Sequence, residues 1–262
     1  MRTKSILELF KDTDLNSIPS HGLLLDYLES LATIEDDYLQ KQLLKELIHK
    51  YVILENRVDS LLKNTLPEAV AEEIKYEGKF SPRPYDCTIL FSDFVGFTRL
   101  AEKISGEILI TTLDKIFTEF DLIVDYYKGT KIKTIGDAYM TVFGAPVQFD
   151  DHALRALRTA MAWFKHLDIF NKESPLQFQM RIGIHTGKVM AGVVGKERMQ
   201  FDVFGDDVNI ASRFESSGEE GRINVSENTY LETREYFEFE ERGLVHLKNK
   251  KSMKAYFVTR EL

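Results

Sequence analysis

Two aspartates of this chain stand in apolar surroundings, where a carboxylate needs a partner. Asp93 ends the apolar run ILF in the segment ILFSDFVGFT, and Asp137 lies between the apolar segments TIG and AYMTVF. A buried carboxylate without a partner costs several kcal/mol or takes up a proton. Oxygen ligands without cysteine or clustered histidine are typical of Mg²⁺ or Mn²⁺ sites. The two acids therefore predict a metal site, with one alternative left open: Asp93 caps the next helix and Asp137 is an ordinary turn residue.

The elements around the two acids determine whether they can meet. Strand and helix patterns alternate as a strand, a helix, a hairpin, a helix and a strand, over 87–94, 104–129, 131–144, 152–170 and 177–187. This is the ferredoxin-like βαββαβ order of an α+β fold, here followed by extra C-terminal strands. In that topology the first strand and the hairpin are neighbours. We expect Asp93, at the strand end, to meet Asp137, at the hairpin tip.

The first part of the chain has a different pattern, and we divide the chain into an N-terminal region, 1–78, and a second domain, 79–262. The N-terminal region is predicted to be helical from about Gly22, after a loop at 17–22. Apolar residues recur there at heptad spacing, at Leu44, Leu47, Tyr51, Leu54, Val58 and Leu61. The spacing predicts a short parallel coiled coil, or a helix packed on its own domain by the same stripe. A short helix is expected over 66–74, followed by a break at 77–86 that contains two prolines.

Composition narrows the function classes. The formal net charge of −8 argues against broad binding to nucleic acid. The chain has a single cysteine, Cys87, which excludes an internal disulfide. Cys87 begins a predicted strand, so we expect its side chain to be buried in the core. The chain has no signal-peptide pattern and no apolar run long enough to span a bilayer, which predicts a soluble, cytoplasmic protein. A membrane segment upstream of this sequence stays open.

Four segments, in order, carry a resemblance to a known family. ILFSDFVGFT, KIKTIGDAYM, RIGIHTGKVMAGVVG and FDVFGDDVNIASRF together resemble the catalytic domain of class III adenylyl cyclases, over about residues 80 to 260. The segment LPEAVAEEI resembles the coupling helix that often precedes these domains. The resemblance implies conversion of ATP to 3′,5′-cyclic AMP and pyrophosphate, with two Mg²⁺ or Mn²⁺ ions in each active site.

The resemblance assigns the phosphate end of the site. Asp93 and Asp137 would hold both ions, and Phe94 would contribute only its backbone carbonyl. The backbone of VGFT, which includes Gly96, Phe97 and Thr98, would bind the triphosphate at a helix N-terminus. Lys248 matches a contact to the terminal phosphate, although Asn249 stands where the family often has glycine. Arg198 is a further candidate for a phosphate contact.

The resemblance also assigns the base and the reacting groups. Lys133 would donate to adenine N1 and Asp202 would accept from its amino group, whereas a guanine-selective member would carry Glu and Cys there. Asn209 would orient the ribose, and Arg213, four residues later on the same helix face, would stabilise charge in the transition state. His185 is more consistent with a packed histidine than with a general base. Asp206 and Asp207 are more consistent with turn acids than with metal ligands.

In this family the metal acids come from one domain and the other residues come from its partner. This chain has both sets, which predicts a head-to-tail homodimer with parallel N-terminal helices. The remaining alternatives are a guanylyl cyclase, and a silent cyclase-like module that only dimerises. The chain lacks the GG(D/E)EF signature of diguanylate cyclases, which argues against that class. A metal phosphohydrolase would normally need more His or Asp ligands for its metal ions.

Overall fold

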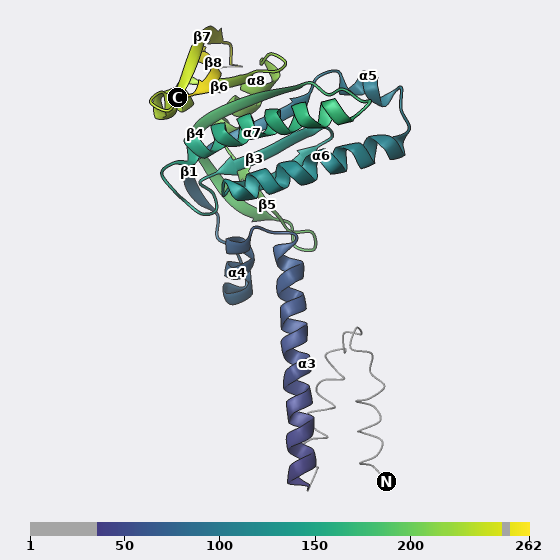
Figure 1. Cartoon of the computed structure of the whole chain (residues 1–262). Coiled ribbons are helices and arrows are strands. Elements are labelled where there is room, and N and C mark those ends of the chain that lie inside the picture. The colour runs from purple at the N-terminus through teal and green to yellow at the C-terminus, as the bar shows by residue number, and fades with distance from the viewer. Residues whose placement is uncertain (1–35, 248–251) are drawn as a thin grey trace. The chain divides into compact units, whose positions relative to one another are not determined.

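The computed structural model describes residues 36–247 and 252–262 (Figure 1). They belong to two units that divide between Thr65 and Leu66. In the first unit the described element is helix α3 (Asp37–Lys63). Asp36 caps it by accepting hydrogen bonds from the amides of Tyr38 and Leu39, at 3.0 and 3.1 Å. The predicted loop at 17–22 and the predicted start of the helix lie outside the described residues.

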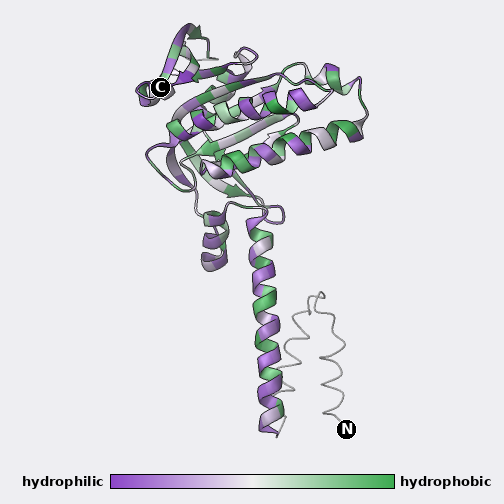
Figure 2. Ribbon diagram, in the orientation of Figure 1, coloured by the Kyte–Doolittle hydropathy of each residue, from purple (hydrophilic) through white to green (hydrophobic). Residues whose placement is uncertain are grey.

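Apolar and polar residues alternate along α3, as the bands of colour in Figure 2 show. Four of the six heptad residues are exposed, namely Leu44, Tyr51, Val58 and Leu61. A stripe of large exposed side chains is consistent with either of the two predicted uses, so the coiled coil stays a prediction.

Helix α4 (Glu68–Glu77) opens the second unit, 66–262, whereas the sequence placed the boundary at 78/79. The difference has a packing reason. Val70 and Ala71 are buried, and Glu73 forms an ion pair of 2.5 Å with Arg83 of the first strand. These contacts tie α4 to the sheet domain.

In the described part of the second unit, eight strands form one sheet in the order β2-β3-β1-β4-β6-β8-β7, with β5 paired to β4. The strands are β1 (Arg83–Phe94), β2 (Thr130–Ile135), β3 (Ala138–Phe143), β4 (Met180–Val194), β5 (Gln200–Phe204), β6 (Ile223–Ser226), β7 (Phe237–Val245) and β8 (Met253–Glu261). The helices are α5 (Phe97–Ala101), α6 (Gly106–Tyr126), α7 (His152–Glu173), α8 (Asp206–Ser216) and α9 (Glu227–Thr233). The β4-β1-β3-β2 part is the predicted ferredoxin-like core, and β6, β7 and β8 extend it.

Strand β1 begins at Arg83, inside the segment predicted to be irregular. The reason is long-range pairing: β1 runs antiparallel to β4 from Arg83 opposite Ala191 to Phe94 opposite Met180. Pro84 is tolerated near the start of this strand. Local composition predicted a break that the partner strand overrides.

The sheet has two unlike faces. Figure 1 shows α6 and α7 side by side over one face, where they enclose the main apolar core. Even-numbered β4 residues such as Ile182 and Ile184 belong to that core. Because strand side chains alternate, the odd-numbered residues point to the opposite face, which α8 covers. No helix in the described residues is long and apolar enough to cross a membrane.

Candidate active site

The two predicted metal acids lie together at one edge of the sheet. β1 pairs with β3 up to Ser92 opposite Tyr139, so Asp93 at the end of β1 lies beside the turn that carries Asp137. Burial raises the pKa of Asp137; its own backbone amide opposes this rise, and contact with the Asp93 carboxylate adds to it. Two carboxylates in contact are a donor set suited to a hard divalent cation.

A cation that sequence reasoning did not assign already contacts one of these acids, Asp93. Arg181 lies opposite Asp93 in the β1–β4 register and donates to its Oδ2 atom at 2.7 Å. The same guanidinium donates from Nε to Glu215 Oε1 at 2.6 Å. Arg181 stands in the quoted segment RIGIHTG, and the signal that could have found it is its register opposite the end of the first strand. Glu215, after the last predicted site residue of α8, had no comparable signal.

The Arg181–Glu215 pair is substantially buried. The side chain of Glu215 is only 10% exposed and that of Arg181 is 29% exposed. Burial raises the pKa of Glu215, while the hydrogen bond from Arg181 opposes that rise. For Arg181, burial acts to lower the pKa, but the bonds to Glu215 and Asp93 prevail and raise it. Arg181 therefore stays cationic between two carboxylates.

Phe94 has its side chain in the core and its backbone at the site. The ring is 3% exposed and lies against Phe117 and Phe178, with centroids 6.1 and 5.2 Å away. This burial accounts for an aromatic residue next to a metal acid. Gly96, with φ of 72°, is the N-cap of α5, whose first intrahelical bonds are donated by Arg99 and Leu100 to the Gly96 carbonyl.

The backbone of the VGFT segment, predicted to bind the triphosphate, differs from that prediction at one residue. The amide of Val95 donates to the carbonyl of Gln179 at 2.8 Å, so it is already used within the sheet. The amides of Gly96, Phe97 and Thr98 precede the first intrahelical bond and are the remaining donors of that segment.

The two predicted base-reading residues are brought into direct contact. Lys133 on β2 and Asp202 on β5 form an ion pair with an Nζ–Oδ2 distance of 2.5 Å. Their side chains are 32% and 13% exposed. Asp202 also accepts from the amide of Val203 at 2.9 Å, through its other oxygen. A donor and an acceptor therefore stand side by side, 69 residues apart in sequence.

Asn209 and Arg213 are both exposed on α8, one helical turn apart. In the described residues, neither a hydrogen bond nor an ion pair joins Asp93 or Asp137 to these two residues or to the Lys133–Asp202 pair. By these contacts the site residues fall into three sets: the two metal acids, the Lys133–Asp202 pair, and the two exposed residues of α8. Arg198 is exposed in the turn between β4 and β5, and Lys248 lies outside the described residues.

The histidine and the cysteine singled out in the sequence are packed inside. His185 is fully buried, and its ring contacts Ser226 Oγ at 2.8 Å and Asp207 Oδ1 at 3.1 Å. Cys87 is also fully buried, and burial raises the pKa of its thiol to about 12. Both were predicted to be packing residues, and the structure confirms this.

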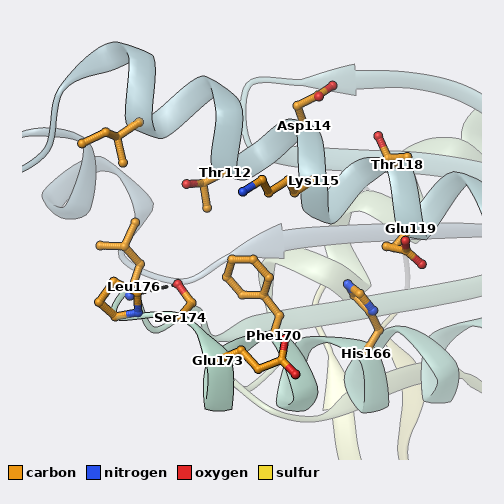
Figure 3. Close-up of a pocket in the computed structure, with 12 residues that line it drawn as sticks. Thr112, Asp114, Lys115, Thr118, Glu119, His166, Phe170, Glu173, Ser174 and Leu176 are labelled. Atoms are coloured by element: carbon orange, nitrogen blue, oxygen red, sulfur yellow. Dashed lines mark hydrogen bonds between the residues drawn. The ribbon is translucent and has the colours of Figure 1, made fainter.

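A pocket of about 710 Å³ lies elsewhere, between α6 and α7 (Figure 3). Thr112 and Lys115 line it from α6, and His166 and Phe170 line it from α7. None of the predicted site residues that the structure describes lines this pocket. We therefore assign the candidate site to the sheet edge and α8 rather than to this pocket.

Comparison with known proteins identifies the family. The chain is similar to the receptor-type guanylate cyclase gcy-28 of Caenorhabditis elegans, with 34% identity over 260 residues, or 97% of this chain and 20% of that protein. It is 37% identical over 211 residues to an adenylate cyclase of Mycobacterium bovis, which covers 78% of this chain and 46% of that protein. The chain therefore spans between about a fifth and a half of these relatives.

Among solved structures, the chain resembles the catalytic core of a rhodopsin-guanylyl cyclase with converted specificity, in complex with ATPαS. The TM-score is 0.66 and the identity 36%, over 68% of this chain and 98% of that one. The family model described as the adenylate and guanylate cyclase catalytic domain matches residues 81–260. The chain belongs to this family, as a class III nucleotidyl cyclase catalytic domain that follows an N-terminal helical segment.

Proposed function

We propose that this domain is an adenylyl cyclase, which converts ATP to 3′,5′-cyclic AMP and pyrophosphate. The observation that carries this choice is the Lys133–Asp202 ion pair. Adenine presents an acceptor at N1 and a donor at its amino group, and guanine presents the reverse. A lysine and an aspartate held side by side match adenine, and guanine would leave both groups wrongly paired.

The names of the relatives do not determine the nucleotide. They include guanylate and adenylate cyclases, and one similar catalytic core is a guanylyl cyclase of converted specificity bound to ATPαS. The base-facing side chains of this chain are therefore the better guide. The similarity to guanylate cyclases keeps GTP as the second candidate substrate.

In the proposed reaction the ribose 3′-oxygen attacks the α-phosphorus. The bond from that phosphorus to the oxygen bridging the α- and β-phosphates breaks, pyrophosphate leaves, and the 3′-hydroxyl proton is lost. Asn209 would orient the ribose, and Arg213 would stabilise the negative charge that develops on the phosphoryl group. The amides of the Gly96–Thr98 segment, with Arg198 and Lys248, would hold the phosphates.

Asp93, Asp137 and the Phe94 carbonyl would hold two Mg²⁺ or Mn²⁺ ions. The facing carboxylates and the raised pKa of Asp137 fit such a cation site. When bound, the ions would supply acidification of the attacking hydroxyl and neutralisation of the leaving phosphates. In the described residues, no group of three or more His, Cys, Asp or Glu side chains is arranged to hold a metal.

We also propose a head-to-tail homodimer, because the metal acids and the α8 residues of one chain lie in separate groups. Each active site would combine Asp93 and Asp137 of one chain with Lys133, Asp202, Asn209 and Arg213 of the other. The exposed stripe of α3 would pair in parallel with its copy.

One assay tests the proposal. Purified protein is supplied with Mn²⁺ and either ATP or GTP, and cyclic nucleotide and pyrophosphate are both measured. We expect cyclic AMP and pyrophosphate in equal amounts from ATP and much less product from GTP. Preferential use of GTP would support the guanylyl alternative, and no product from either nucleotide would support the silent module.

A further inference from the structure

One face of β4 is built to receive helix α8. The residues that point to it are the alternate members of the segment RIGIHTG: Arg181, Gly183, His185 and Gly187. All four meet α8, and they do so in order along the strand. We call these four residues the β4 track, and α8 is the helix that packs against them.

The two glycines allow the close approach. A Cβ on Gly183 would lie 1.9 Å from the amide nitrogen of Glu215, and a Cβ on Gly187 would lie 2.5 Å from the carboxyl carbon of Asp207. No real Cβ tolerates such distances. Because the atoms near Gly183 belong to the backbone of α8, a side chain there would push the end of the helix away from the sheet. A side chain at Gly187 would displace the carboxylate of Asp207.

The histidine between the glycines holds the first turn of α8. His185 contacts Asp207 Oδ1 at 3.1 Å, and its ring lies over Phe214 with an interplanar angle of 17°. Asp207 Oδ2 accepts from the amide of Lys188 at 2.8 Å. The N-terminal turn is thus bonded to the strand through both oxygens of one carboxylate.

Arg181 connects the last turn of α8 to the metal acids. Its guanidinium donates to Asp93 at 2.7 Å and to Glu215 at 2.6 Å, so it contacts both carboxylates at once. Glu215 is two residues after Arg213 on the same helix. In the proposed dimer, Asp93 serves one active site and Arg213 serves the other.

We propose that the Asp93–Arg181–Glu215 bridge couples cation binding at the metal acids to the position of α8, and so links the two active sites of the dimer. This inference rests on the proposed function. Arg181 is a positioning residue in it, shared between two carboxylates. A divalent cation on Asp93 weakens the attraction of that carboxylate for Arg181. The guanidinium then turns more fully to Glu215 and tightens the end of α8.

Hydrogen–deuterium exchange on the full chain, with and without Mn²⁺ and without nucleotide, measures this coupling. Two amides report the end of α8: Ser217 donates to the Arg213 carbonyl at 3.0 Å, and Gly218 donates to the Glu215 carbonyl at 2.8 Å. We expect Mn²⁺ to slow their exchange by about threefold or more in the wild-type protein. If exchange at these two amides of the wild-type protein were unchanged under saturating Mn²⁺, that result alone would overturn the inference.

Two variants break the bridge in different ways. Glu215→Gln keeps the shape but removes the charge, and Arg181→Lys keeps the charge but loses the fork that reaches both carboxylates. In both, Mn²⁺ binding followed by electron paramagnetic resonance should persist within about tenfold of wild type, while the slowing at residues 217 and 218 is lost. Glu238→Gln is the matched control, because it breaks the exposed Arg260–Glu238 pair and should leave the response intact.

The outcomes separate the two proposals. Mn²⁺ bound with unchanged α8 exchange, or a response retained in both bridge variants, would refute the coupling alone. Loss of Mn²⁺ binding in both variants would assign Arg181 and Glu215 to the metal site itself and would also refute it. Failure of the wild-type protein to bind Mn²⁺ and to cyclise either nucleotide would count against the proposed function.

Discussion

The two faces of the sheet carry different kinds of residue. On the face under α6 and α7, contacts are apolar and aromatic: Trp163 is fully buried and stacked on Phe120, with centroids 4.4 Å apart and planes 10° from parallel. On the face under α8, the β4 track supplies an arginine, a histidine and two glycines.

The difference shows where the molecule concentrates stability and where it concentrates chemistry. The face under α6 and α7 buries large side chains, and burial of apolar surface supplies most of the free energy of folding in a domain of this size. The buried apolar cluster on the α8 face is smaller, and this face also holds charged groups in fixed hydrogen bonds. Substitutions on the first face should therefore affect folding, and those on the second should affect activity.

The largest expected effect is loss of activity on the α8 face. Asp93→Ala and Arg213→Ala should each lower kcat by on the order of 10²–10³-fold or more. An equal mixture of the two variants should recover about a quarter of wild-type activity, because half of randomly formed dimers are mixed and each holds one intact site. Cyclic AMP formation by the mixture measures this, and a mixture as inactive as its components would contradict shared sites.

The next effect concerns the choice of base. Replacing Lys133 with Glu and Asp202 with Cys should shift the ratio of kcat/KM for GTP over ATP by about 10²–10⁴-fold, because each base would then meet the opposite set of donors and acceptors. Competition assays with both nucleotides give the ratio. Lys131→Glu is the control, since Lys131 lies on the same strand but pairs with Asp121 at 2.7 Å. An unchanged ratio in the double variant would remove the base-reading role.

A pair of core substitutions compares the faces directly. Trp163→Ala should cost about 3–5 kcal/mol of unfolding free energy and leave kcat per folded molecule near wild type. Gly183→Ala should cost about 1–3 kcal/mol and yet lower kcat by about tenfold, because the added methyl displaces α8. Denaturant unfolding and active-site-normalised rates test both. If the fall in kcat relative to the fall in unfolding free energy were the same in both variants, the two faces would not differ in function.

The smallest effect is on pH dependence and involves His152, the first residue of α7. It is 8% exposed, and its Nδ1 atom lies 2.9 Å from Thr88 Oγ1. Burial lowers its pKa from the ordinary 6.5, against the opposing effect of Asp86, Asp151 and Asp150. The unfolded chain then takes up its proton at a higher pH than the folded one. Stability is unaffected above 6.5 and is lost as the pH falls below it, by about 1.4 kcal/mol for each unit of pKa difference.

Thermal unfolding of wild type and His152→Gln tests this expectation. The melting temperature of the wild-type protein should fall more steeply than that of the variant between about pH 7.5 and 5.5. Activity at pH 7.5 should be the same in both once it is corrected for the folded fraction. Parallel pH profiles would exclude His152 as the source.

Much of the fold could be predicted from local patterns. The order of strands and helices from β1 to β4 follows from apolar periodicity and from the Gly136-Asp137 turn, and the pairing of β1 with the hairpin follows from that order. The boundary near α4 and the start of β1 could not be predicted, because a partner strand and an ion pair at Arg83 decide them.

The sequence by itself determined which residues are candidates for chemistry: two acids in apolar surroundings, and, through the family resemblance, a lysine, an aspartate, an asparagine and an arginine. Tertiary structure alone decided which of them meet. It paired Lys133 with Asp202, tied Asp93 to Glu215 through Arg181, and left Asn209 and Arg213 outside those contacts. The physical reason is register: these contacts depend on how strands and helices pair across long sequence separations, and no local pattern encodes that.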